Sequence, residues 1–172
     1  MSKSRLTKFL KECDKSELED QLLDLYLRFK PVKEFYDFSF SPNEDKFFDA
    51  ARLKISKEYF PEGKRRAKKR RSVAQKEIEH LKKLEVDAMR LIDLMLFNIE
   101  IAQTYNAEKP IVQEAFYKSM LSSFRKLLVF INQQFAVAEF TPRVIEIKKT
   151  ALTQKWINAE GFNLAIAELL ED

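Results

Sequence analysis

The residue types best suited to metal binding or nucleophilic catalysis are scarce in this chain. His80 is the only histidine and Cys13 the only cysteine among 172 residues. Glu77 and His80 have the Glu-x-x-His spacing that places a carboxylate and an imidazole on one helix face. A di-iron bundle needs two such motifs, and a tetrahedral zinc site needs more than one histidine and one cysteine. Cys13 and His80 also lack the accompanying motif of a catalytic pair. We therefore expect no metal, no cofactor and no recognisable catalytic residue.

Glycines and carboxylates limit the remaining enzymatic alternatives. The chain has only two glycines, Gly63 and Gly161, which cannot build a glycine-rich phosphate loop. Its 27 acidic residues are plentiful, but a general acid and base pair is recognised by geometry rather than by sequence. An enzyme with an unidentified carboxylate site therefore stays open as an alternative.

A short run of positive charge is the most distinctive feature of the sequence. Seven of the eight residues in the segment 64–71 are cationic, yet the whole chain carries a net charge of only +4, so the rest is net negative. Clustered like charges repel one another and are best tolerated where water or an anionic partner screens them. The candidate contacts for such a partner are Lys64, Arg65, Arg66, Lys68, Lys69, Arg70 and Arg71.

Two interpretations of this basic run remain open: a solvated loop beside acidic helices, or a contact for an anionic partner such as nucleic acid. A helix that began at Lys64 would crowd cations at its N-terminus, which the macrodipole disfavours by about 0.3–1 kcal/mol per group. The capping-box pattern from Ser72 to Gln75 instead predicts that the helix begins after the run. We therefore expect an exposed basic loop.

Aromatic residues suggest a second kind of contact. Tyr59 and Phe60 immediately precede the basic run and could stack on nucleic-acid bases. Phe38 and Phe40 flank Ser39 in a segment that we expect to be a loop. These four aromatic residues either pack between the N-terminal helices or form a groove for a partner helix or peptide.

The elements that must position these residues are predicted to be helices. Helix-start patterns occur at Ser16 to Glu19, at Ser41-Pro42, at Ser72 and at Thr141-Pro142. Apolar residues recur at helical spacing behind these starts, with Leu169 in the last stripe. This periodicity predicts eight helices, over about residues 6–10, 18–29, 47–59, 74–84, 87–105, 116–131, 144–156 and 162–169.

The sequence therefore predicts an all-α fold of about eight helices in antiparallel pairs, as a short superhelical array or a bundle. We expect one domain over residues 1–172, with a weak boundary at the basic loop 61–71. The N-terminus lacks the apolar core of a signal peptide, and charges interrupt the most apolar stretch, Leu91 to Ala102. We expect a cytoplasmic protein without a membrane contact.

Several segments resemble a family of small, all-helical bacterial proteins catalogued as a domain of unknown function. They cover most of the chain after about residue 50 and contain no chemical motif. They are Glu58-Tyr59-Phe60-Pro61, Arg71-Ser72-Val73-Ala74, Leu84-Glu85-Val86-Asp87, Leu94-Met95-Leu96-Phe97, Ala115-Phe116-Tyr117-Lys118-Ser119 and Gly161-Phe162. The resemblance implies a helical protein of no assigned activity in which the basic segment before Ser72 recurs.

Together these observations favour a non-enzymatic binding or scaffold module that engages an unidentified protein or a polyanion. The alternative is a nucleic-acid-binding protein that uses the basic run 64–71. The enzyme with an unidentified carboxylate site is the second alternative.

Overall fold

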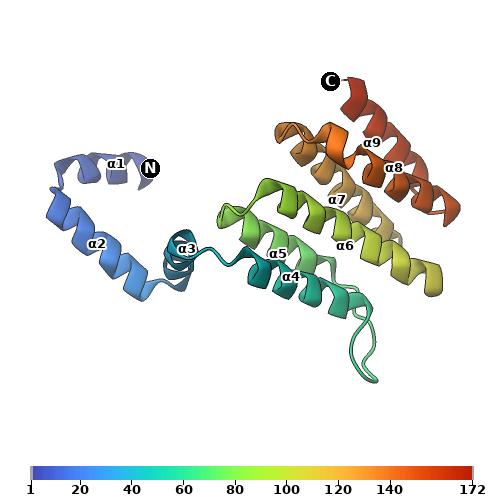
Figure 1. Cartoon of the computed structure of the whole chain (residues 1–172), viewed down its shortest axis with the longest axis horizontal. Helices are drawn as coiled ribbons and strands as arrows, with labels where there is room; N and C mark the ends of the chain where they lie inside the picture. The colour runs from blue at the N-terminus through green and yellow to red at the C-terminus, as the bar shows by residue number, and fades with distance from the viewer. Residues whose placement is uncertain (1, 172) are drawn as a thin grey trace. The chain divides into compact units, whose positions relative to one another are not determined.

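The computed structural model is built from α-helices and connecting loops (Figure 1). It describes the backbone of residues 2–171 and the side chains of residues 3–168, so the expected core side chain of Leu169 lies outside the described residues. Within this part the chain forms nine helices and no strand, which confirms the all-α class. The helices are α1 (Ser2–Glu12), α2 (Lys15–Arg28), α3 (Lys30–Phe40), α4 (Glu44–Tyr59), α5 (Arg71–Lys83), α6 (Ala88–Glu108), α7 (Glu114–Gln133), α8 (Val137–Thr153) and α9 (Ala159–Glu171).

The chain divides into two compact units, Met1–Asn43 and Glu44–Asp172. The first unit contains α1 to α3 and the second contains α4 to α9. The basic loop 61–71, where the sequence suggests a weak boundary, lies inside the second unit and connects α4 to α5. The single domain over residues 1–172 stays a prediction.

The first unit contains the helix that the periodicity missed. The helix predicted over about residues 18–29 ends before Pro31, and no helix is predicted between Pro31 and about residue 47. Pro31 lies in the first turn of α3, where its missing N–H costs no hydrogen bond. The expected loop at Phe38 and Phe40 is therefore wrong, because both residues belong to α3. Phe38 is 7% exposed and Phe40 is 80% exposed, as expected for opposite faces of a helix.

The starts of several helices differ from the predicted caps. α2 begins with a capping box at Asp14 and not at Ser16: the Asp14 carboxylate accepts from the Glu17 N–H, and the Glu17 carboxylate accepts from the Asp14 N–H. Ser41 is the C-cap residue of α3. Ser72 lies inside α5, one residue after its start at Arg71. A capping pattern thus indicates a nearby helix start and not its exact residue: Asp14 caps α2 in place of Ser16, and no side chain caps α5.

Pro142 is a further correction, because it lies within α8 rather than at its start. A tight turn in which Phe135 has a positive φ of 55° starts the helix earlier, at Val137. The Thr141 hydroxyl donates to the carbonyl of Val137 at 2.6 Å, so it bonds within the helix and does not cap it. The solvent-exposed proline forfeits one backbone hydrogen bond there.

The core of the second unit is centred on α6 and α7. α6 packs against α4, α5, α7 and α8, while α9 packs against α7 and α8. α6 is accordingly buried on more than one face, with Ile92, Leu94 and Leu96 all shielded from solvent. Arg143 of α8 binds Glu100 of α6 with hydrogen bonds of 2.8 and 2.9 Å and adds a polar link between these two helices.

No helix in the described part of the chain is both long enough and apolar enough to cross a membrane.

Candidate binding site

The basic run is held at its C-terminal end by a buried carboxylate. Glu58, in the last turn of α4, is 6% exposed. Its carboxylate accepts from the Arg70 backbone N–H at 3.0 Å and from the Arg70 guanidinium at 2.6 Å. The backbone carbonyl of Glu58 accepts from the Lys69 N–H at 2.9 Å. The segment between α4 and α5 is therefore a closed loop whose end is fixed beside the end of α4.

This arrangement also fixes the charge of Glu58. The hydrogen bonds from Arg70 lower the pKa of the Glu58 carboxyl, and they outweigh the opposing effect of burial. Glu58 is therefore ionised at neutral pH. The same pairing raises the pKa of Arg70. Arg70 thus compensates an internal charge and is a structural member of the run.

The structure divides the seven cations of the run into two groups. Besides Arg70, Arg71 donates from its guanidinium to the carbonyl of Ala115 in α7, and the Lys69 ammonium lies 5.6 Å from the centre of the Tyr105 ring. The second group is exposed and forms no ion pair with any other described residue. It consists of Lys64, Arg65, Arg66 and Lys68.

A polar pocket of about 510 Å³ lies at the start of α5. None of its lining residues is acidic. One of the cations around it, Arg70, is paired with Glu58, which lies outside the lining. The pocket is lined by Lys68, Lys69, Arg70, Arg71, Ser72, Gln75 and Ser119.

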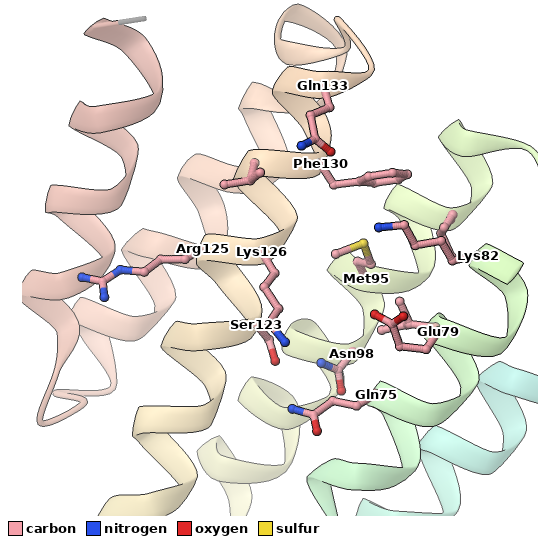
Figure 2. A pocket seen from close by; sticks show the side chains of 13 residues that line it. Gln75, Glu79, Lys82, Met95, Asn98, Ser123, Arg125, Lys126, Phe130 and Gln133 are labelled. Atoms are coloured by element: carbon pink, nitrogen blue, oxygen red, sulfur yellow. The ribbon is translucent and has the colours of Figure 1, made fainter. Parts of the chain in front are cut away.

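Gln75 also lines a second pocket, a groove of about 690 Å³ formed by α5, α6 and α7 (Figure 2). Apolar side chains from all three helices form much of its surface, including Ile78, Met95 and Phe130. The Lys82 ammonium lies 5.3 Å from the centre of the Phe130 ring and so connects α5 to α7 across one end. The remaining lining residues are Glu79, Leu91, Asn98, Ser123, Arg125, Lys126, Val129 and Gln133.

Positive charge exceeds negative charge inside this groove. Glu79 is the acidic residue of its lining, and Lys82, Arg125 and Lys126 are the basic ones. Figure 2 shows Lys126 directed along the groove toward Ser123, whereas Arg125 points away from α5. Two ammonium groups, from Lys82 and Lys126, are therefore available to a ligand in the groove.

Asn98 of α6 has a side-chain carbonyl without a hydrogen-bond donor in the lining of the groove. It is 3% exposed, and its side-chain oxygen Oδ1 forms no hydrogen bond. Figure 2 shows its amide on α6 between Gln75 and Ser123. Leaving a buried carbonyl without a donor costs about 1–3 kcal/mol, so an amide at this position needs a reason. A ligand with a hydrogen-bond donor would satisfy it.

The four aromatic candidates do not form one surface. Tyr59 is 3% exposed, and its ring packs 5.9 Å from Tyr105, so it is not accessible for stacking. Burial raises the pKa of its hydroxyl. Phe60 packs edge-on against the same tyrosine at 5.7 Å but stays 37% exposed. Phe38 and Phe40 belong to the first unit.

The two scarce reactive residues lie in different units. Cys13 is at the junction of α1 and α2, where its Sγ accepts a long hydrogen bond of 3.8 Å from Gln21. His80 is half-buried on α5, with its ring centre 6.4 Å from that of Phe47. Within the described residues, no group of three or more potential metal ligands occurs.

Comparison with known proteins identifies the family. The sequence pattern of a family of unknown function, DUF6155, matches residues 1–171. The chain belongs to this family. The match confirms the resemblance seen in the sequence and extends it to the N-terminal helices. Searches among curated proteins and among solved structures found no match.

Sequence reasoning missed the groove of this DUF6155 protein. Its walls combine α5 and α7, which are separated in the chain by α6. The available signal was Asn98, a polar residue in the most apolar stretch of the sequence. It reads as an interruption of that stretch, and only the packed helices show that its amide faces an open groove.

Proposed function

We propose that this DUF6155 protein is a helical binding module for an acidic protein partner, which it contacts through the basic loop and the adjoining groove. One observation carries the proposal. Among the described residues, Lys64, Arg65, Arg66 and Lys68 form no ion pair with a carboxylate, and Lys68 lines a polar pocket that shares Gln75 with an apolar groove. An acidic segment with apolar side chains matches both parts.

The anchoring of the loop supports this proposal. The hydrogen bonds that Lys69 and Arg70 donate to Glu58 fix the end of the loop before any partner binds. A prearranged cationic loop loses less conformational entropy on binding, which improves affinity. Clustered positive charge also raises the rate at which an acidic partner associates.

The groove favours a protein over a simple polyanion. Its surface between α5 and α7 is largely apolar, and Lys82 and Lys126 add positive charge. A polyanion such as heparin has no apolar groups to place there. A peptide has them, and its N–H groups are the donors that Asn98 Oδ1 lacks.

Nucleic-acid binding is the second candidate, because Phe60 is 37% exposed next to the unpaired cations. Phosphates would contact the loop, and a base would stack on Phe60. In that case the groove would play no part, which separates the two candidates.

Fluorescence anisotropy with two probes tests the proposal: a labelled peptide of Glu, Leu and Ala, and a short labelled DNA duplex. Changing Lys64, Arg65, Arg66 and Lys68 to Gln should weaken peptide binding about tenfold or more. The matched control changes Lys109, Lys118, Lys149 and Lys155 to Gln, which removes the same charge from exposed sites outside the loop and groove. It should have less than about a twofold effect.

A second variant separates the candidates. Val129→Asp places a carboxylate on an exposed groove residue and should abolish peptide binding. Duplex binding that exceeds peptide binding and is insensitive to Val129→Asp would establish the nucleic-acid candidate instead. Unchanged binding of both probes by the loop variant would show that the loop is only a solvated connection.

A further inference from the structure

The first two helices have apolar stripes that the first unit does not bury. Leu6, Phe9 and Leu10 of α1 are 41–54% exposed, and Leu18, Leu22 and Leu25 of α2 are 37–43% exposed. Phe29, directly after α2, is 52% exposed, and no residue of α2 is buried. Exposed apolar residues that line up along a helix in this way indicate an interaction site.

The spacing of these residues is that of a helix-pairing seam. Leu18, Leu22, Leu25 and Phe29 follow one another at intervals of four, three and four residues, which is the a/d pattern of a coiled coil. Leu6 and Phe9 of α1, and Cys13 directly after it, have the same pattern at intervals of three and four residues. Residues with this spacing pack into the side of another helix.

The rest of the first unit leaves the seams open. α2 packs against α3, where the Tyr26 hydroxyl donates to Asp37 at 2.6 Å. Tyr26 lies beside the seam, so this contact does not cover Leu18 or Leu22. Among the described residues, α1 packs against no helix to a comparable extent. Both seams therefore need a helix from outside the unit.

Charge indicates which helix covers each seam. α1 carries four basic residues and one acidic residue, whereas α2 carries four acidic and two basic residues. Two α1 helices repel each other, and so do two α2 helices, but α1 attracts α2. We propose that two copies of the chain associate through this surface, with α1 of each copy packed on α2 of the other.

The available area fits a modest dimer. Seven large side chains that are about half exposed offer on the order of 500 Å² of apolar surface per copy, or about 1,000 Å² for the pair. This is the lower limit for a specific interface, so we expect association at micromolar concentrations. The isologous arrangement repeats the α1–α2 contact twice and closes at two copies. It does not depend on the basic loop or the groove.

Sedimentation equilibrium of the full chain at low salt tests this proposal. The mass should rise from one chain to two across micromolar concentrations and no further. Leu22→Asp, which introduces a charge into the seam, should weaken association at least tenfold while circular dichroism keeps its helical signal. Leu152→Asp is the matched control, because Leu152 on α8 is 42% exposed and Leu22 is 43% exposed. It should leave the mass distribution unchanged.

Charge exchange tests the pairing itself. Lys3→Glu with Arg5→Glu should weaken the dimer, and so should Glu19→Lys with Asp24→Lys. All four changes in one chain should restore it, because α1 becomes acidic and α2 basic. Pairing of α1 with α1 would instead be strengthened by Lys3→Glu with Arg5→Glu, because the change lowers the repulsion between two α1 helices. That result, or a combined variant that stays dissociated, would overturn the proposed pairing. A wild-type chain that stays monomeric at the highest concentration, or a dimer that Leu22→Asp does not weaken, would overturn the proposal.

Discussion

The two units contain similar amphipathic helices but bury them to different extents. In the second unit, Leu96, Phe124 and Phe162 are fully shielded from solvent. In the first unit, Phe38 is buried, but the leucines of α2 remain exposed. The difference lies in the number of neighbours, because α6 is surrounded by four helices and α2 packs against α3. An apolar stripe becomes a core only where enough other helices cover it.

This contrast also concerns free energy. Complete burial of a leucine or phenylalanine side chain stabilises a fold by about 1.5–3 kcal/mol, which half-exposed side chains contribute only in part. Most of the stability should therefore reside in the second unit. The exposed stripes of the first unit are the surface that we propose for dimerisation. Five predictions test this comparison and the packing of the second unit, in order of decreasing expected effect.

The same substitution should have very different effects in the two units. Phe124→Ala removes a side chain that is 0% exposed and should lower the free energy of unfolding by about 3–5 kcal/mol. Phe9→Ala removes a side chain that is 47% exposed and should cost less than about 1 kcal/mol at dilute protein concentration. Urea titrations followed by circular dichroism measure both. Equal losses would show that α1 is buried in solution.

Substitution of Arg70 should lower the free energy of unfolding more than substitution of its partner Glu58. Arg70→Ala leaves a buried carboxylate with no cationic partner and should cost about 2–4 kcal/mol. Glu58→Gln leaves a guanidinium that is 56% exposed and can bind water, so it should cost about 1 kcal/mol. Urea unfolding of both variants at pH 7 checks this order. The reverse order would mean that the carboxylate is hydrated.

The same pair predicts a pH dependence. Because Arg70 holds the pKa of Glu58 below its ordinary value of 4.5, the unfolded state binds the proton first as the pH falls. The stabilisation that the Glu58–Arg70 pair provides is complete above pH 4.5. It is lost as the pH falls through the lower pKa that Glu58 has in the folded state. Arg70→Ala should flatten this part of the stability profile. Urea midpoints measured between neutral and acidic pH follow the change, with Lys109→Ala as an exposed control.

Two buried amides of α6 should respond with opposite signs. Asn98→Leu removes an unsatisfied carbonyl from the apolar groove and should stabilise the protein by about 1 kcal/mol. Gln103→Leu should destabilise it by about 1–3 kcal/mol, because the Gln103 amide donates to the Ile147 carbonyl at 2.7 Å. Thermal unfolding compares the two. Destabilisation by Asn98→Leu would indicate that a water or a neighbour satisfies Asn98.

The smallest effect should come from a change within the open seam of the first unit. Trp156 is the only tryptophan and is 4% exposed in the second unit, so its fluorescence reports the unfolding of that unit. Leu22→Asp should shift the fluorescence-detected free energy of unfolding by less than about 0.5 kcal/mol. A larger shift would show that the two units unfold together.

The candidate site was predictable in part. The basic run and its position between α4 and the start of α5 follow from residue type and order in the sequence. Which cations are engaged does not, because Glu58 and Ala115 reach Arg70 and Arg71 only through packing. The groove was not predictable either, because α5 and α7 are separated in the chain by a whole helix.

The sequence by itself determined the helical class, the approximate extent of most helices and the place where positive charge accumulates. These properties depend on neighbours within a few residues, through helical periodicity, glycine and proline placement and local charge. Only the tertiary structure decided that Pro31 begins a helix, that Tyr59 is buried, and that Asn98 faces a groove. Burial depends on which helices from distant parts of the sequence pack together. The amphipathic helix α2 packs against α3, whereas α7 packs against α6, α8 and α9.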